Sequence, residues 1–278
     1  MTPYYRIVRT LGWPLAKLIF WFKPRHREVI PKQGGFILCC NHTSYLDIAF
    51  LVLTCKRQIF FMAKEELFHN KFMGWFYRNM GGFPIKRGAG DTAAMEKAEE
   101  IVRRGDILGI FPEGTRTRDI EGRPQRAKSG VTIIANATGA DVLPAAINYH
   151  GRVRPFRRID VRYGDMIPNE RLRVNLDSRS ELKRATGEIM GTIVNMWEEM
   201  GGPSAGQRAA GEAARRAAAE EKTRRTAPQK DAAGQAKIAN EQVTEDAGRG
   251  EDAKQTQRDA SVQQGSNTAA TARREAEK

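Results

Sequence analysis

The sequence predicts a single α/β domain built on one mixed, mostly parallel sheet that helices cover on both faces. Short apolar runs, typical of buried strands, alternate with longer segments of helical periodicity through residues 1–200. Consecutive parallel strands need crossover connections, which are usually helices. This alternation therefore favours a mainly parallel sheet over a series of hairpins. The expected strands are residues 35–40, 58–63, 82–87, 106–111, 142–147 and 159–163.

Helices are expected between these strands, and capping residues mark two of their starts. Ser44 and Asp91 each precede a helical segment, and their side-chain oxygens can accept hydrogen bonds from the free N–H groups of a first turn. The segment 64–80 carries many large apolar side chains, which suit the core or a groove for an apolar ligand. The expected helices are residues 44–53, 64–80, 91–103, 129–138 and 178–200.

Residues 1–24 are predicted to form an amphipathic helix that lies in a membrane interface. Thr2 and Pro3 are typical of a helix start, and Pro14 is expected to kink the helix. The uninterrupted apolar run, residues 18–22, is far shorter than the roughly 20 residues that cross a bilayer. Aromatic side chains alternate here with cations, which suits the headgroup region of an anionic membrane surface. The alternative is a helix that packs on the domain's own core.

The cysteines and the N-terminal segment indicate the cellular context. No small-residue cleavage site follows the first helix, so it is not interpreted as a secretory signal. Cys39, Cys40 and Cys55 form no spaced framework and are expected to be reduced thiols inside a cell. The four histidines are far apart and outside any zinc-binding spacing, so no metal site is expected. We expect a monotopic or peripheral protein on the cytoplasmic face of the cell membrane.

Residues 201–278 are expected to be a disordered, low-complexity tail. They contain no Phe, Trp, Tyr, Leu or Cys, so they cannot bury enough apolar surface to offset the entropy of ordering. The Ala/Glu/Arg-rich part, residues 211–225, is expected to be marginally helical. The folded domain is therefore expected to span residues 25–200, after the interface helix of residues 1–24.

The chain carries a net charge of +13, most of it in residues 1–200. An excess of this size favours anionic partners such as phosphorylated substrates, acidic carrier proteins or anionic lipid surfaces. A nucleic-acid-binding module would also explain the charge, but the sequence has no arginine-rich recognition helix. Nucleic acid is therefore not an expected partner.

Polar side chains follow several of the expected strands. His42 and Asp47 follow residues 35–40, and a Glu-Gly-Thr-Arg turn follows residues 106–111. Loops at the carboxyl ends of parallel strands share one sheet edge, so we expect these groups to converge. Asp47 could simply cap a helix together with Ser44. It can also meet His42 if the histidine precedes the helix, because residues five apart on one ideal helix diverge by about 140°.

Four motifs occur in an order that resembles a known family. They are N-H-T-S-Y-L-D at 41–47, G-F-P-I-K-R at 82–87, F-P-E-G-T-R-T at 111–117 and V-L-P-A-A-I at 142–147. Over about residues 26–168 the chain resembles the glycerophospholipid acyltransferases and looks most like the bacterial 1-acyl-glycerol-3-phosphate acyltransferases. The H-x-x-x-x-D element alone is a weak signal, but its combination with F-P-E-G-T-R is highly specific.

The resemblance implies transfer of a fatty acyl group from a thioester of coenzyme A or acyl carrier protein to the sn-2 hydroxyl of lysophosphatidic acid, giving phosphatidic acid. No cofactor is expected beyond this acyl donor. An alcohol is a poor nucleophile until its proton is removed, so His42 is the expected general base. Asp47 is expected to orient the imidazole and stabilise its cation, as in the serine hydrolase triad.

The expected substrate-binding residues gather cations and a flexible turn around this pair. Gly114 permits close backbone approach, and an arginine can bind phosphate through two parallel hydrogen bonds. Lys128 precedes a helix whose free N–H groups favour anions. The full set is Arg87, Glu113, Gly114, Thr115, Arg116 and Lys128.

Other interpretations of the sequence remain. A relative of this family could act on a different lyso-lipid acceptor. Residues 88–93 match the dinucleotide fingerprint and suggest a nicotinamide-dinucleotide enzyme, although no acidic residue stands about twenty positions further on. Residues 202–206 match a hydrolase nucleophile elbow but lie in the tail with no strand before them. Cys40 could accept the acyl group itself, although burial in an apolar strand would raise the pKa of its thiol.

Overall fold

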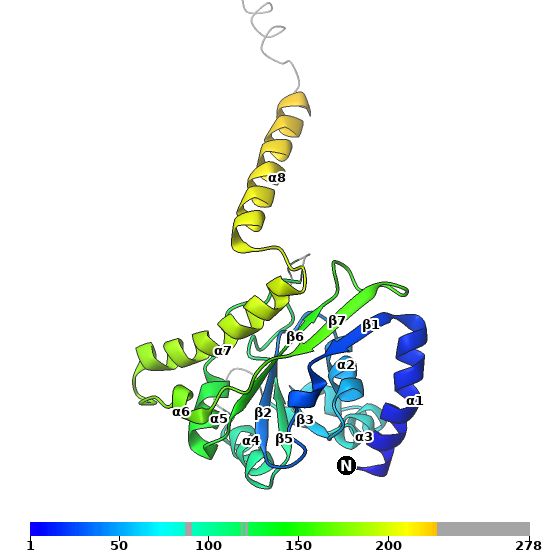
Figure 1. Cartoon of the computed structure of the whole chain (residues 1–278), viewed down its shortest axis with the longest axis vertical. Helices are drawn as coiled ribbons and strands as arrows, with labels where there is room; N and C mark the ends of the chain where they lie inside the picture. The colour runs from blue at the N-terminus through cyan, green and yellow to red at the C-terminus, as the bar shows by residue number, and fades with distance from the viewer. Residues whose placement is uncertain (87–90, 118, 120–121, 227–278) are drawn as a thin grey trace, which may run out of the picture. The chain divides into compact units, whose positions relative to one another are not determined.

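The structure is a computed structural model that describes residues 1–86, 91–117, 119 and 122–226 (Figure 1). The chain divides into two compact units, Met1–Arg208 and Ala209–Lys278. All the strands of the described residues belong to the first unit.

The first unit is built on a seven-stranded sheet with the order β1-β7-β6-β2-β5-β3-β4. Neighbouring strands are parallel except for β6 and β7, which are antiparallel. The predicted mixed, mostly parallel sheet is therefore confirmed. The strands are β1 (Trp21–Arg25), β2 (Phe36–Cys40), β3 (Ile59–Lys64), β4 (Gly82–Ile85), β5 (Ile107–Ile110), β6 (Val142–Asn148) and β7 (Arg158–Tyr163).

Helices cover both faces of this sheet, as predicted. They are α1 (Pro3–Ile19), α2 (Leu46–Thr54), α3 (Lys71–Asn79), α4 (Thr92–Arg103), α5 (Gly130–Thr138), α6 (Asn169–Leu172) and α7 (Arg179–Glu199), with 3-10 turns η1 (Arg27–Val29) and η2 (Glu65–Phe68). Alternate residues of β2 point to opposite faces. Ile37 and Cys39 pack with α4, α5 and α7, whereas Leu38 and Cys40 pack with α1 and α2. The strand that leads to the candidate site is thus buried on both sides.

The N-terminal helix begins as the sequence predicted, and it is tied into the domain. Thr2 caps α1 by accepting a hydrogen bond from the Tyr5 backbone N–H, and the helix continues through Pro14 to Ile19. Tyr5 is fully buried, and its hydroxyl donates to the Arg57 carbonyl. Other side chains of α1 are exposed. Among the described residues, no helix combines the length and the apolar character that a membrane span requires.

The boundary expected at residue 24 falls inside a strand. Trp21–Arg25 form β1, which pairs in parallel with β7 at one edge of the sheet. An edge strand tolerates Pro24, which lacks a backbone N–H, because one side of that strand has no partner to bond. Aromatic residues next to cations were interpreted as the end of an interface helix. Phe22, only 1% exposed, instead belongs to the core.

Two other segments differ from the prediction. The helix expected over residues 64–80 is broken into η2 and α3, because Asn70 accepts a hydrogen bond from the Met73 N–H and starts a new helix. In the tail, Ala205–Thr226 form helix α8, in agreement with the high helix propensity of its many alanines. The rest of the expected disordered tail, residues 227–278, lies outside the described residues.

The position of Phe22 predicts that β1 is required for stability. Its ring lies 5.2 Å from the rings of both Trp13 and Phe50. We expect Phe22→Ala to lower the free energy of unfolding by about 3–5 kcal/mol, the usual cost of truncating a buried aromatic residue. Trp21→Ala, on the exposed side of the same strand, should change it by less than about 0.5 kcal/mol. Urea unfolding of both variants is the measurement, and equal effects would show that β1 does not belong to the core.

Candidate active site

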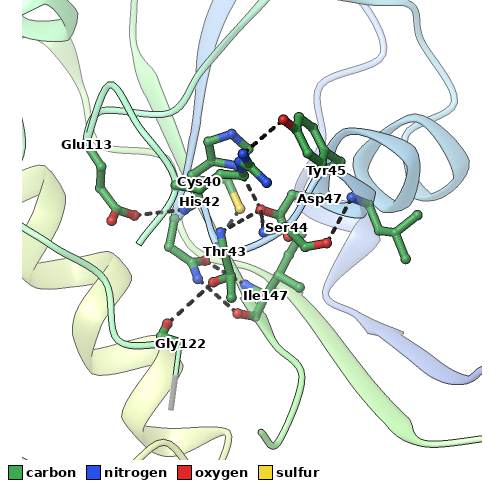
Figure 2. Close-up of polar contacts among 12 residues, drawn as sticks. Cys40, His42, Thr43, Ser44, Tyr45, Asp47, Glu113, Gly122 and Ile147 are labelled. Carbon is green, nitrogen blue, oxygen red and sulfur yellow. Dashed lines mark hydrogen bonds and ion pairs between the residues drawn. The ribbon is translucent and has the colours of Figure 1, made fainter. Parts of the chain in front are cut away.

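His42 and Asp47 lie at the sheet edge where β2 ends and α2 begins (Figure 2). His42 is in the loop after β2, and Asp47 is in the first turn of α2. The imidazole Nδ1 lies 2.8 Å from the Asp47 Oδ2. The contact forms because the histidine precedes the helix, as the sequence predicted. With Nδ1 bound to the carboxylate, Nε2 is the ring nitrogen that can exchange a proton with a substrate.

The His42 ring is also held through its face. Phe111 stacks on the imidazole, with 4.1 Å between the ring centroids and 19° between the planes. Phe61 stacks on Phe111 in turn, at 5.8 Å. The His42 side chain keeps 13% of its surface exposed. The ring is therefore accessible but fixed in orientation.

The Asp47 carboxylate is fully buried and accepts four hydrogen bonds. Oδ2 accepts from His42 and from the backbone N–H groups of Thr43, at 2.7 Å, and Ser44, at 2.8 Å. Oδ1 accepts from the Tyr149 hydroxyl at 2.5 Å. The bond to Ser44 is one half of the capping box that the sequence suggested as an alternative role. Asp47 therefore both caps α2 and orients His42.

Tyr149 and Asn41 support the pair, and sequence reasoning missed both roles. Burial, and then the negative charge of Asp47, raise the pKa of the Tyr149 hydroxyl well above its ordinary value, so it stays protonated and donates. The Asn41 amide donates to the Ile147 carbonyl at 2.9 Å and accepts from the Ile147 N–H at 2.8 Å. This fixes the start of the His42 loop to β6. Both residues follow strands at the edge that carries His42, which is the one signal that could have indicated them.

Glu113 holds the backbone of His42 from the other side. Its Oε1 accepts from the His42 N–H at 2.7 Å, and its Oε2 accepts from the Gln125 N–H at 2.9 Å. Figure 2 shows Glu113 and Asp47 on opposite sides of the histidine backbone. We expected Glu113 to bind substrate, but it is 4% exposed and both carboxylate oxygens already accept backbone N–H groups. The structure gives Glu113 a positioning role instead.

The environment of Glu113 also shifts its proton affinity. Burial raises the pKa of this carboxyl to about 7. The two backbone N–H groups oppose the shift, and the negative charge of Asp47 adds to it. Two carboxyl groups therefore flank His42, and the Glu113 carboxyl titrates near neutral pH.

The structure brings Gly114 and Lys128 together. Gly114 follows Glu113 with φ of +71°, a left-handed conformation that favours glycine. A Cβ atom at this position would come within 3.0 Å of the Lys128 Cε, so the lysine side chain lies directly against the glycine. The Lys128 backbone N–H donates to the Pro112 carbonyl at 2.8 Å, which closes the loop. The Lys128 ammonium group is thereby placed beside the turn after β5.

Arg116 is held against the His42 loop. Its guanidinium carbon lies 3.6 Å from the centroid of the Tyr45 ring, and its Nη2 donates to the Tyr45 hydroxyl at 2.9 Å. The neighbouring Thr117 N–H donates to the His42 carbonyl at 2.7 Å. Thr115 is exposed in the same turn. Two cations, Arg116 and Lys128, thus accompany the histidine at one sheet edge.

Arg87 and residues 88–90 lie outside the described residues. The role of Arg87 and the dinucleotide fingerprint therefore stay predictions. Asp91 caps α4, accepting from the Ala94 N–H at 3.1 Å. In the part of the chain that the structure describes, no group of three His, Cys, Asp or Glu side chains is placed to hold a metal ion.

Comparison with known proteins shows which family this chain resembles. Residues 22–148 match the family model described as Acyltransferase, from β1 to the end of β6 and including every site residue that the sequence predicted. Over this segment the chain is similar to acyltransferases. It is 36% identical over 125 residues to the 1-acyl-sn-glycerol-3-phosphate acyltransferase of Bacillus subtilis, covering 45% of this chain and 61% of that one. The corresponding enzyme of Streptococcus pneumoniae is 28% identical over 177 residues, 60% of each chain.

The chain is also similar to a protein named for another acceptor and to a solved structure. A lyso-ornithine lipid O-acyltransferase of Pseudomonas aeruginosa is 33% identical over 146 residues, covering 51% of this chain and 54% of that one. The matches span about three fifths of the length of the first two relatives. The crystal structure of an LPA acyltransferase from Thermotoga maritima superposes with a TM-score of 0.57 at 23% identity, covering 72% of this chain and 81% of that one. This last likeness concerns the fold.

Cys40 is not built as a nucleophile. It is fully buried, and its thiol donates to the Asn41 Oδ1 at 3.6 Å. Burial, and then the negative charges of Asp47 and Glu113, raise the pKa of the thiol well above its ordinary value. A neutral, enclosed thiol is a poor acyl acceptor.

The pKa of Glu113 predicts how the stability of the folded unit depends on pH. Up to about pH 7 the folded state keeps the Glu113 proton, whereas the unfolded chain releases it near pH 4.5, so stability falls as pH rises through this window. The expected loss is roughly 3 kcal/mol, from about 1.4 kcal/mol for each pKa unit. Glu113→Gln has no such proton to release. The excess of the parent's free energy of unfolding over the variant's should therefore shrink between pH 5 and pH 8. Urea unfolding at both pH values measures it, and parallel pH profiles would contradict the assignment.

Proposed function

We propose that the protein transfers a fatty acyl group from a thioester of coenzyme A or acyl carrier protein to the free sn-2 hydroxyl of 1-acyl-glycerol-3-phosphate. The product would be phosphatidic acid, a precursor in phospholipid synthesis. The observation that carries the proposal is the oriented His42–Asp47 pair with two cations at the same sheet edge. Relatives at up to 36% identity that bear the name of this activity support it.

The geometry supplies the steps of such a transfer. His42 Nε2 removes the proton of the acceptor hydroxyl while that oxygen attacks the thioester carbonyl carbon. The tetrahedral intermediate collapses, the C–S bond breaks, and the imidazolium returns the proton to the departing thiolate. Asp47 stabilises the imidazolium through its contact with Nδ1. No enzyme group is acylated on this route, in agreement with the burial of Cys40.

The cations favour an acceptor that carries phosphate. Arg116 presents a planar guanidinium held by Tyr45, and Lys128 adds an ammonium beside Gly114. Such groups bind phosphate oxygens by charge-assisted hydrogen bonds. An ornithine-based lipid has no phosphate to offer them. We therefore place lysophosphatidic acid ahead of the lyso-ornithine lipid acceptor that names another relative.

We further propose that the enzyme works as a peripheral protein on the cytoplasmic face of the cell membrane. The exposed side of α1 supports this, because large apolar side chains stand there next to cations. Leu11 is 68% exposed and Leu18 is 73% exposed. Such a surface suits the interfacial region of a membrane whose lipids are anionic. The acceptor, a lyso-lipid that carries one acyl chain, would reach the site from the same membrane.

Transfer activity tests the proposed function directly. Purified protein is incubated with acyl-thioester and either lysophosphatidic acid or lyso-ornithine lipid, and released thiol and lipid product are measured. We expect turnover with the phosphate acceptor, a loss of about 10²- to 10⁴-fold in kcat for His42→Ala, and a smaller loss for Asp47→Asn.

Two controls separate this mechanism from a covalent one. Cys40→Ala should keep most of the turnover, and intact-mass analysis of enzyme with donor alone should find no acyl adduct. An adduct on Cys40 that disappears when acceptor is added would replace direct transfer with an acyl-enzyme. Faster turnover with lyso-ornithine lipid would show that this lipid, rather than lysophosphatidic acid, is the preferred acceptor.

The role of Arg116 predicts a selective change in substrate affinity. We expect Arg116→Ala to raise the KM for lysophosphatidic acid about tenfold, the effect of losing a charge-assisted hydrogen bond worth ~1.5 kcal/mol. The KM for the thioester should change little. Arg179→Ala, an exposed arginine at the start of α7, is the matched control. A larger effect on the donor than on the acceptor would show that Arg116 binds the thioester.

A further inference from the structure

The connection between β6 and β7 places an apolar ring among cations at the molecular surface. Phe156 is 65% exposed, although a large aromatic side chain is ordinarily turned inward. Arg152, Arg154 and Arg157 surround it in the sequence and are all exposed. Within the described part of the chain, none of these three arginines has a carboxylate within ion-pair distance.

The backbone conformation and its hydrogen bonds hold Phe156 in its exposed position. Its φ is +58°, a conformation that bulky side chains seldom adopt. The Phe156 N–H donates to the Ile19 carbonyl at 2.7 Å, and the Arg157 carbonyl accepts from the Trp21 N–H at 3.1 Å. These bonds attach the connection to the end of α1 and the start of β1. Two backbone hydrogen bonds thus hold the segment that carries the exposed aromatic ring.

The base of the connection is also fixed. Asp160 on β7 is fully buried, and its Oδ2 lies 2.7 Å from both the His150 Nε2 and the Arg158 Nε. His150, which itself has a φ of +50°, begins the connection directly after Tyr149. The segment is therefore a built structure rather than a loose loop, and its exposed side chains keep their positions.

Phe156 lies next to the end of α1, and the exposed side of that helix is apolar. Leu11, Leu15 and Leu18 follow one another at helical spacing and are 68%, 55% and 73% exposed. Trp21, 65% exposed, follows them at the point where β1 meets the β6–β7 connection. Figure 1 shows α1, β1 and the connection on the same side of the domain. We call the set Leu15, Leu18, Trp21, Arg152, Arg154, Phe156 and Arg157 the docking face.

We propose that the docking face binds an anionic lipid bilayer, with Phe156 inserted at headgroup depth and the three arginines on lipid phosphates. Aromatic rings beside cations, continuous with an exposed leucine row, match the chemistry of a membrane interface. An acidic protein surface would complement the arginines but would offer no apolar contact to Leu18, Trp21 and Phe156. The proposal extends membrane contact from α1 to a second element, and it does not depend on the identity of the acyl acceptor.

Site-directed labelling tests the insertion. Cys39, Cys40 and Cys55 are all buried, so a cysteine introduced as Phe156→Cys can be labelled selectively with an environment-sensitive fluorophore. Asp177→Cys, an exposed position just before α7, is the matched control, because α7 and α1 pack on opposite faces of the sheet. Full-length protein is mixed with phosphatidylcholine vesicles with or without 30% phosphatidylglycerol, and with brominated lipids as depth quenchers.

With anionic vesicles we expect a blue shift and quenching at position 156 and neither change at position 177. Equal quenching at both positions, or no change at 156 while the protein floats with the vesicles, would overturn the proposal. So would a probe at 156 that responds to acyl carrier protein and not to vesicles.

Charge and ring variants test the energetics by vesicle flotation. Arg154→Gln with Arg157→Gln should weaken binding to anionic vesicles roughly 30-fold, on the scale expected for two cations near a charged surface. Phe156→Asn, a residue that tolerates positive φ, should weaken binding without lowering Tm. Arg173→Gln with Arg179→Gln is the charge-matched control and should bind as the parent does. Binding unchanged in the first two variants contradicts the proposal.

Turnover of a short-chain, water-soluble acceptor is measured in parallel with flotation. The docking-face variants should keep the parent's turnover there, so a failure of docking is distinguished from a failure of the proposed acyl transfer. A loss of turnover on the soluble acceptor, at an unchanged bound fraction, would show that the arginines belong to the active site instead.

Discussion

A carboxylate without solvent exposure is stable only when hydrogen bonds replace its water, and Asp47 obtains four of them. The donors come from the loop after β2 and from Tyr149 after β6, so the bonds join two strands through one charged group. This requirement sets the path of the backbone from residue 42 to residue 47. The orientation of His42 is a by-product of satisfying a buried charge.

The opposite side of His42 obeys a similar requirement with a different outcome. Glu113 is nearly as buried, and burial raises its pKa to about 7, while its two oxygens accept two backbone N–H groups. The partners of each carboxyl therefore decide its task. Asp47 stabilises positive charge on the imidazole, while Glu113 joins the turn after β5 to the histidine. Gly114, Thr115 and Arg116 are brought to the site through that second connection.

Local patterns in the sequence were sufficient for the sheet and for the central contact. Short apolar runs predicted β2, β3, β5 and β6, because a parallel strand is buried on both faces and needs no alternation. β4 and β7 were predicted from shorter apolar patterns that include charged residues. The approach of His42 to Asp47 followed from a turn of five residues. β1 was missed because Pro24 and its exposed neighbours resemble a helix end more than a strand, and only pairing with β7 reveals it.

Contacts between distant residues could not be predicted in this way. Tyr149 and Asp47 are 102 positions apart, and no motif marks the tyrosine. The direction in which Glu113 points depends on the Gln125 N–H, which belongs to a loop whose course the sequence leaves open. The resemblance to a family named Glu113 as important, but it gave the residue a substrate rather than two backbone partners. Geometry was needed to separate these roles.

The stacking of Phe111 on the imidazole has a kinetic consequence. The ring is fixed on its face by Phe111 and at Nδ1 by Asp47, so it cannot rotate. Every proton transfer between His42 and a substrate therefore uses Nε2. In the proposed reaction the acceptor oxygen and the donor sulfur must therefore both lie within reach of that one nitrogen. Direct transfer then requires a site that holds both substrates together against a single edge of the imidazole.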